Sequence, residues 1–159
     1  MRQILLFGAG KSSTALITYF LQNAKAENWQ LTVADANEST IREKIGDSPY
    51  AQAVALDITD TGGRSTLIEK ADIVISLLPA SLHYLVAIDC LRRKKNLLTA
   101  SYVDEAIREL KEEIEKAGLL FLCEMGLDPG IRTGRARAGD RRGEHRHAGS
   151  QRERRRNSL

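Results

Sequence analysis

The chain has 159 residues, of which 42% are hydrophobic, 28% charged and 5% aromatic. Those proportions fit one soluble domain and leave little room for a second. No apolar run approaches the roughly 20 residues that span a bilayer, and the first run ends at Gly8, too early for a signal-peptide core. Cys90 and Cys123 lie far apart, which argues against a disulfide framework and a zinc site. We therefore expect a cytoplasmic protein with no membrane partner.

Positive charge is concentrated at the C-terminal end. Residues 132–159 contain ten arginines and three acidic residues, a formal charge of +7, which leaves −4 of the total of +3 for residues 1–131. No large apolar side chain occurs between residues 132 and 158. Apolar burial cannot offset the entropy of ordering such a segment, so we expect a disordered basic tail. Residues 1–131 are the predicted folded domain.

Apolar runs alternate with helical patterns along this domain. The predicted buried strands are residues 4–7, 31–34, 53–56, 72–78, 96–101 and 119–123. The predicted helices are residues 12–25, 37–45, 59–70, 80–95 and 104–116. In the first helix, the apolar residues with helical spacing are Ala15, Leu16, Tyr19 and Phe20. Six apolar strands separated by helices predict an α/β fold with a doubly wound, Rossmann-like parallel sheet covered on both faces.

A glycine-containing turn joins the first predicted strand to the first predicted helix. The turn has the sequence Gly8-Ala9-Gly10-Lys11-Ser12-Ser13. Gly8 permits the tight turn, Gly10 lets a pyrophosphate approach the backbone, and the helix N-terminus supplies free N–H groups. Ser13 stands where the third glycine of the usual pattern belongs, which loosens the match. The strand–turn–helix context favours dinucleotide binding over a purely structural turn.

A nucleoside-triphosphate loop is the competing interpretation of Gly10-Lys11-Ser12. That motif needs a glycine five residues before Gly10, and the chain has Leu5 there, inside the strand. The loop is too short to wrap a triphosphate, which largely excludes this alternative.

Acidic residues end the second and third predicted strands. Asp35 is placed to accept hydrogen bonds from the adenosine ribose, and its carboxylate repels a 2′-phosphate, which favours NAD over NADP. The alternative role for Asp35 is a helix N-cap, which Asn37 can fill instead. Asp57 either contacts the adenine edge or caps the next helix, and the sequence favours neither.

Further polar residues are expected at the same carboxyl edge of the sheet. Ser76-Leu77-Leu78-Pro79 ends the fourth strand, where its backbone would border the ribose and nicotinamide. His83 follows in the first turn of a helix, where a solvated or capping role is more common than catalysis. Ser101 and Tyr102 end the fifth strand. Glu124 and Asp128 follow the sixth, although Asp128-Pro129-Gly130 alone indicates only a turn.

Four segments together resemble the saccharopine dehydrogenase family, and most closely its glutamate-forming, saccharopine reductase-like branch. They are Gly8-Ala9-Gly10-Lys11-Ser12-Ser13, Ser76-Leu77-Leu78-Pro79, Thr99-Ala100-Ser101-Tyr102-Val103 and Glu124-Met125-Gly126-Leu127-Asp128-Pro129-Gly130-Ile131. The last is the most specific, because a bare Rossmann fold has no need of it. The resemblance covers residues 1–131, which would be the N-terminal NAD(P)-binding domain.

The resemblance implies an NAD(P)-dependent oxidoreductase of lysine and amino-acid metabolism. Its substrate would be saccharopine or a similar imine-derived amino-acid adduct, with hydride passing between the nicotinamide and a carbon–nitrogen bond. The glycine loop, Asp35 and Leu78-Pro79 would hold the cofactor. The residues facing the substrate would be Ser101, Tyr102 and Asp128. Members of this branch are often NADP-linked, whereas the carboxylate of Asp35 favours NAD.

The resemblance ends after Ile131. In the family, Gly-Ile continues into Asp-His and a large substrate-binding domain, whereas here Arg132-Thr133-Gly134 follows. The Arg-rich segment resembles a GC-rich reading frame translated out of register, so we expect a chain truncated after the cofactor-binding domain. Such a chain is expected to bind the dinucleotide weakly without turnover. Its uncovered apolar surface favours self-association as a homo-oligomer.

Two functions of other classes compete with the oxidoreductase. One is a dinucleotide-binding module with no chemistry of its own. The other is nucleic-acid binding through the Arg-rich tail, which would be non-specific because no aromatic side chains interleave with the arginines to stack on bases.

Overall fold

Six parallel strands form one sheet in the computed structural model, which describes residues 1–125. The strands are β1 (Arg2–Phe7), β2 (Trp29–Asp35), β3 (Ala51–Ala55), β4 (Ile73–Ser76), β5 (Asn96–Thr99) and β6 (Phe121–Leu122). Their order is β3-β2-β1-β4-β5-β6, so the chain changes direction across the sheet between β1 and β4. The predicted doubly wound parallel sheet is confirmed. Ligands of such sheets bind at the carboxyl ends of the strands beside this switch point.

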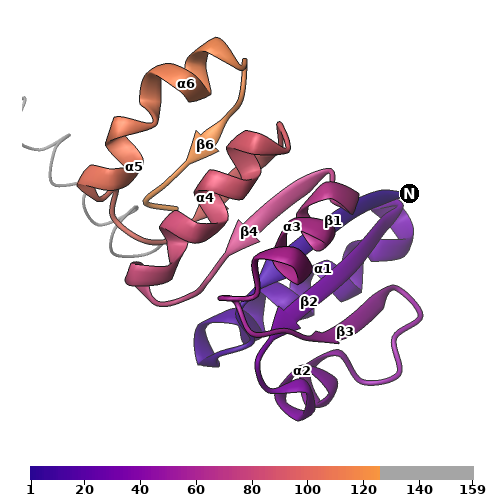
Figure 1. Cartoon of the computed structure of the whole chain (residues 1–159). Coiled ribbons are helices and arrows are strands. Elements are labelled where there is room, and N and C mark those ends of the chain that lie inside the picture. The colour runs from indigo at the N-terminus through magenta and orange to yellow at the C-terminus, as the bar shows by residue number, and fades with distance from the viewer. Residues whose placement is uncertain (126–159) are drawn as a thin grey trace, which may run out of the picture.

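Helices cover both faces of the sheet (Figure 1). The first face carries α1 (Thr14–Glu27) and α2 (Glu38–Ile45), with the short 3-10 helix η1 (Lys11–Ser13) leading into α1. The second face carries α3 (Thr61–Lys70), α4 (His83–Arg92), α5 (Glu105–Glu109) and α6 (Lys111–Lys116), with η2 (Ala80–Leu82) leading into α4.

The central position of β1 in the sheet explains why its sequence is apolar without alternation. Successive side chains of a strand point to opposite faces, and here both faces are covered. Ile4 and Leu6 pack with α1 and α2, whereas Leu5 and Phe7 pack with the helices of the second face. Each fully buried side chain of this size contributes roughly 1.5–3 kcal/mol to folding. The unbroken apolar run therefore supplies both cores.

Two helices differ from the sequence-based expectation. In α1 the buried residues are Ile17, Phe20 and Ala24, whereas Tyr19 is 55% exposed and contacts Phe20 edge-to-face at 6.1 Å between ring centroids. The predicted helix 104–116 is divided into α5 and α6 at Leu110, whose N–H donates to the Ile107 carbonyl three residues back. This tighter turn keeps Leu110 in the core.

Further expectations concern membrane segments, the two cysteines and the C-terminal segment. No helix within residues 1–125 is long and apolar enough to cross a membrane. Cys90 and Cys123 are free thiols, and the cytoplasmic location stays a prediction. Asp128, the domain boundary after residue 131 and the basic tail 132–159 lie outside the described residues.

Candidate functional site

The glycine turn leaves β1 at the switch point and passes close to the end of β4. Gly8 has a φ of +99°, a conformation that side-chain-bearing residues rarely adopt. A Cβ at this position would lie 2.9 Å from the Leu77 carbonyl oxygen. Glycine is therefore required both by the turn and by the approach of the two backbones.

Asp35, at the end of β2, holds the turn from the other side. Its Oδ2 accepts a hydrogen bond from the Ala9 N–H at 2.7 Å, and its Oδ1 accepts one from the Asn37 N–H at 3.0 Å. The N-cap of α2 is Asn37, whose Oδ1 accepts from the Thr40 N–H. Capping is thus the role of Asn37, and the half-buried Asp35 carboxylate borders the glycine turn.

The start of η1 and α1 presents backbone N–H donors at the carboxyl edge of the sheet. Within residues 1–125, no group accepts a hydrogen bond from the N–H of Gly10, Lys11 or Ser12. All three residues are exposed. Ser13 is fully buried, and its N–H and hydroxyl both donate to the Gly10 carbonyl. Unpaired N–H groups at a helix start favour an anion, as the positive end of the helix dipole also does.

A lysine of α2, which the sequence did not single out, fixes the turn from the side. Lys44 Nζ donates to the Gly10 carbonyl at 2.5 Å and to Thr14 Oγ1 at 2.9 Å, and lies 3.3 Å from Ser13 Oγ. These three acceptors match the three N–H donors of an ammonium group. Lys44 therefore holds the loop rather than extending into solvent. Its position in α2 carries no local signal of this contact.

The other predicted cofactor residues lie on the two sides of the glycine turn. Leu78 is half-buried in the second-face core, and exposed Pro79 precedes η2. Asp57, after β3, accepts hydrogen bonds from the N–H and hydroxyl of Thr59. The backbone hydrogen bond, reinforced by that of the hydroxyl, lowers the pKa of Asp57.

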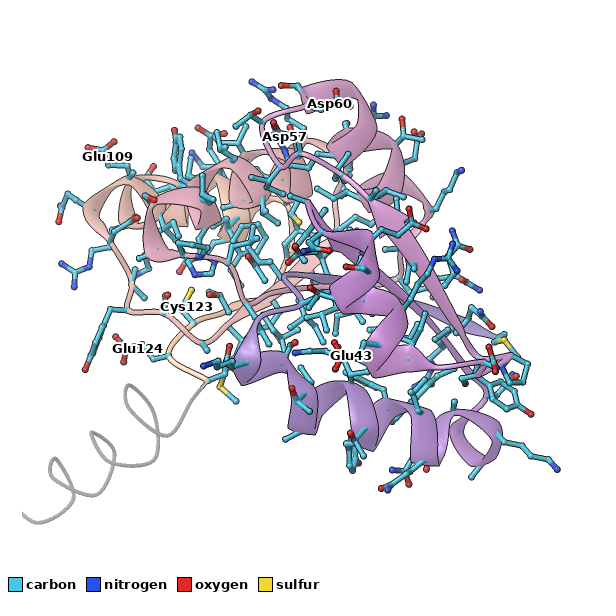
Figure 2. All side chains as sticks on the ribbon, turned by 90° about the horizontal axis from the view of Figure 1, so that it is seen from below. Glu43, Asp57, Asp60, Glu109, Cys123 and Glu124 are labelled. Carbon is cyan, nitrogen blue, oxygen red and sulfur yellow. The ribbon has the colours of Figure 1, made fainter. Side chains whose placement is uncertain are left out.

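The capping role considered for Asp57 is wrong, because α3 has another N-cap. Asp60 Oδ1 accepts from the N–H groups of Gly62 and Gly63 at 3.0 and 3.1 Å. Figure 2 shows Asp57 and Asp60 near each other in the turn before α3. The contact of Asp57 with an adenine stays a prediction.

Polar side chains from β4, β5 and α4 meet at the carboxyl edge on the other side of the switch point. His83 Nδ1 lies 2.8 Å from Ser76 Oγ, and His83 Nε2 lies 2.8 Å from Ser101 Oγ. Thr99 Oγ1 is 3.3 Å from both ring nitrogens. Ser101 is half-buried and Tyr102 is 57% exposed, so both predicted substrate-facing residues are at the surface of this edge.

The expectation that His83 is solvated or caps a helix is wrong. Its side chain is 2% exposed, because α4 packs its first turn onto the ends of β4 and β5. Burial lowers the pKa of His83, and the nearby charge of Asp104 opposes this effect only in part. The imidazole is therefore neutral at neutral pH, with one donor and one acceptor nitrogen.

The chain after β6 lines the same edge. The N–H of Glu124 donates to the Ser101 carbonyl and that of Met125 to the Thr99 carbonyl, at 3.0 and 3.1 Å. Glu124 has a positive φ of 61°, and Figure 2 shows its side chain next to Cys123. Burial, reinforced by the charges of Glu124 and Asp104, raises the pKa of the Cys123 thiol. The final residues described therefore approach Ser101 through the backbone.

Concave surfaces occur elsewhere on residues 1–125. A groove of about 690 Å³ lies between α4 and the last helices, lined by Tyr84, Ile88 and Leu110 among others. It is on the outer helical face and contains none of the predicted site residues. Residues 1–125 contain no group of three or more His, Cys, Asp or Glu side chains placed to hold a metal ion.

The fold and the site together define a dinucleotide-binding α/β domain. A glycine turn with unpaired N–H groups, an acid at the end of the next strand and the switch point between β1 and β4 are the parts that such domains use.

Comparison with known proteins gives the family. Residues 4–122 match the family described as "Saccharopine dehydrogenase NADP binding domain", and the chain belongs to it. The predicted resemblance is confirmed, and with it a nicotinamide dinucleotide as the cofactor class.

Individual relatives agree with this family. The chain is 36% identical over 145 residues to alpha-aminoadipic semialdehyde synthase of Arabidopsis thaliana, covering 80% of this chain and 14% of the relative. It is 35% identical over 133 residues to saccharopine dehydrogenase [NADP(+), L-glutamate-forming] of Saccharomyces cerevisiae, covering 82% and 28%. The chain thus spans under a third of the length of these curated relatives.

A solved structure agrees as well. The apo saccharopine dehydrogenase (L-Glu forming) from Saccharomyces cerevisiae superimposes with a TM-score of 0.79 at 32% identity, over 91% of this chain and 32% of that one. The WlbA (WbpB) dehydrogenase from Thermus thermophilus, in complex with NAD and alpha-ketoglutarate, shares the fold, with a TM-score of 0.58 at 21% identity over 88% and 47%.

Proposed function

We propose that the chain is the dinucleotide-binding part of a saccharopine dehydrogenase-like oxidoreductase, and that it prefers NAD(H) to NADP(H). The observation that carries this proposal is the row of N–H groups on Gly10, Lys11 and Ser12 at the switch point, which have no acceptor among residues 1–125. When bound, the nicotinamide supplies the hydride that passes to or from the carbon–nitrogen bond of an amino-acid adduct.

The residues of this chain bind and orient the dinucleotide. The three N–H groups would donate hydrogen bonds to the diphosphate oxygens at the start of α1, where the helix dipole adds to the attraction. Gly8 keeps the β1 and β4 backbones close together, so the loop stays beside the Leu78-Pro79 segment. That segment would flank the nicotinamide half, on the side of the switch point where Ser101 lies.

The charge around Asp35 supports the preference for NAD(H). Each carboxylate oxygen uses one lone pair on a backbone N–H and retains another for a ribose hydroxyl. A 2′-phosphate at the same place would meet a negative charge. Lys44 would have no N–H left to donate to such a phosphate, because its three donors are already directed at the loop. The family's printed description names NADP, and the preference proposed here for this chain differs from that description.

The substrate side of the proposal rests on Ser101 and Tyr102. Both follow β5 at the carboxyl edge, beside the place proposed for the nicotinamide. A relative is named for its L-glutamate-forming saccharopine dehydrogenase activity, so the substrate proposed here is an amino-acid adduct of that kind. Asp128, proposed as a third substrate-facing residue, lies outside the described residues.

Binding of the two reduced cofactors to the 159-residue chain tests the proposal. We expect NADH to bind at least about tenfold more tightly than NADPH in fluorescence titrations, because about 1.4 kcal/mol of charge repulsion gives that ratio. Asp35→Asn keeps an oxygen for the Ala9 N–H and removes the charge, so it should narrow the ratio by strengthening NADPH binding.

Glu43→Gln is the matched control for this substitution. It removes a negative charge from an exposed position of α2 and should leave the ratio of NADH to NADPH affinity unchanged. Failure of both cofactors to bind contradicts the whole proposal. Tighter binding of NADPH than of NADH by the unaltered chain contradicts the cofactor preference alone.

A binding module without chemistry is the second candidate function, because the glycine turn and Asp35 are groups that bind a dinucleotide and do not react with it. An assay of NADH oxidation with L-glutamate and an aldehyde partner separates the two functions. Turnover supports the oxidoreductase, and tight binding without turnover supports the module.

A further inference from the structure

Three hydroxyl groups surround the buried imidazole of His83. Ser76 and Thr99 are buried, with 0% and 2% of their surface exposed, whereas Ser101 is half-buried and reaches the surface of the carboxyl edge. His83 joins Ser76 Oγ to Ser101 Oγ through two contacts of 2.8 Å, one at each ring nitrogen. These contacts connect the interior of the fold to the proposed nicotinamide side of the site.

A buried hydroxyl group decides which ring nitrogen of His83 carries the proton. A buried serine hydroxyl needs an acceptor for its hydrogen. Among residues 1–125, the partner of Ser76 Oγ is His83 Nδ1. Thr99 Oγ1 accepts from the Ser101 N–H and lies 3.3 Å from both ring nitrogens, so it favours neither. The Ser76 hydroxyl therefore decides the tautomer: Nδ1 accepts its hydrogen, which leaves the proton on Nε2.

The proton on Nε2 fixes the hydroxyl of Ser101. The Nε2–H donates to Ser101 Oγ at 2.8 Å, so the hydrogen of Ser101 is not used on the ring. We infer that His83 is a positioning residue, whose Nε2–H form turns the Ser101 hydroxyl outward as a hydrogen-bond donor to an oxygen of the bound ligand. The lowered pKa of His83 agrees with a neutral ring, with Asp104 as the charged group that opposes it.

The ligand chemistry that fits this donor is a carbonyl or carboxylate oxygen. Resting on the proposed function, two ligand groups offer one: the carboxamide of the nicotinamide and a carboxylate of the amino-acid substrate. In either case Ser101 discriminates against a ligand group that can only donate, because an outward hydroxyl hydrogen is then left unpaired.

The tautomer is measured directly on the unliganded chain. A two-bond ¹H–¹⁵N correlation spectrum distinguishes a protonated from a bare ring nitrogen. We expect protonated Nε2 and bare Nδ1 at pH 7, and in Ser76→Ala a redistribution of the proton towards Nδ1. Protonation of Nδ1 in the unaltered chain, or of both nitrogens, overturns the inference. This experiment needs no ligand, so it is independent of whether the dinucleotide binds.

Substitutions then test the effect on a ligand. Ser101→Ala and His83→Leu should each weaken the binding of an oxygen acceptor about fivefold to tenfold, the worth of one neutral hydrogen bond. His83→Gln keeps an N–H donor on the ring side and should restore most of the affinity. His83→Leu and His83→Gln both remove the imidazole. Recovery of the affinity in His83→Gln alone therefore distinguishes positioning from a merely structural role.

Two pairs of probes identify the oxygen. If it is the carboxamide, Ser101→Ala weakens NADH but leaves ADP-ribose and the thionicotinamide analogue unchanged. If it is a carboxylate, Ser101→Ala weakens L-glutamate binding to the NADH-saturated chain. An unchanged affinity for both NADH and L-glutamate overturns the inference. Loss of all dinucleotide binding in the unaltered chain counts against the proposed function, and the tautomer still decides the role of His83.

Discussion

Replacement of Gly8 by alanine probes the close approach of β1 and β4. Both backbones are fixed by the sheet, because the Gly8 N–H donates to the Ala34 carbonyl and the Leu77 N–H to the Phe7 carbonyl, each at 2.9 Å. An added Cβ would lie 2.9 Å from the Leu77 oxygen and 3.0 Å from its carbonyl carbon. Neither strand can retreat without losing hydrogen bonds of the sheet.

The expected loss of folding free energy in Gly8→Ala has two parts. A non-glycine residue at a φ of +99° is strained by roughly 1–3 kcal/mol. Overpacking against rigid backbone adds about 1–3 kcal/mol. The sum of roughly 2–6 kcal/mol is a large share of the 5–15 kcal/mol that stabilises an ordinary domain. At about 4 °C per kcal/mol, we expect Tm to fall by roughly 8–24 °C in a circular-dichroism melt.

Gly10→Ala is the matched control, because the same substitution meets open space there. Gly10 has a φ of −64°, which alanine adopts freely, and an added Cβ has no neighbour within 4 Å. Tm should therefore stay within about 2 °C of the unaltered chain. The new methyl group stands on the exposed side of the loop, so NADH affinity should fall about tenfold or more.

Each of these two variants has an outcome that would contradict the prediction. A Gly8→Ala protein that melts with the unaltered chain would show that β1 and β4 are not held at the distance described. A Gly10→Ala protein that binds NADH undiminished would show that the diphosphate does not lie against this loop.

Three further expectations concern buried groups. Arg64 and Asp89, 4% and 3% exposed, form an ion pair at 2.7 Å, so Arg64→Met should lower the free energy of unfolding by about 3–5 kcal/mol in urea titrations. Adding Asp89→Leu should restore most of that loss, and a double variant as unstable as the single one would contradict this explanation. Burial holds the pKa of His83 below 6.5, so at mildly acidic pH the unfolded chain binds a proton that the native state does not. The free energy of unfolding should therefore fall as pH drops below about 6.5. Parallel profiles of this free energy against pH for the unaltered chain and His83→Gln would refute the prediction. Burial raises the pKa of Cys90 to about 12 and also raises the pKa of Cys123. Iodoacetamide at pH 8 should therefore label both thiols far more slowly in the native chain than in the unfolded chain. Rapid labelling of Cys90 in the native chain, detected by mass spectrometry, would contradict its burial.

The sequence predicted the layers of the fold because these are local properties of a strand. A strand covered on both faces must be apolar at every position, and the run ending in Phe7 has that pattern. Glycine at position 8 and the acid at position 35 were likewise recognisable, because each belongs to the end of its own strand. The helix ends were less exact, since the division at Leu110 depends on packing against the core.

The side-chain contacts around the site depend on the tertiary structure. Lys44 contacts a loop 34 residues away in the chain, and His83 joins side chains from two strands. Nothing near these residues in the sequence indicates such contacts, because the crossovers and the strand register bring the partners together. The residues themselves were enough to predict a glycine turn after the first strand, because a turn is a local feature. Which side chains hold this turn and orient Ser101 depends on how α2 and α4 pack onto the sheet.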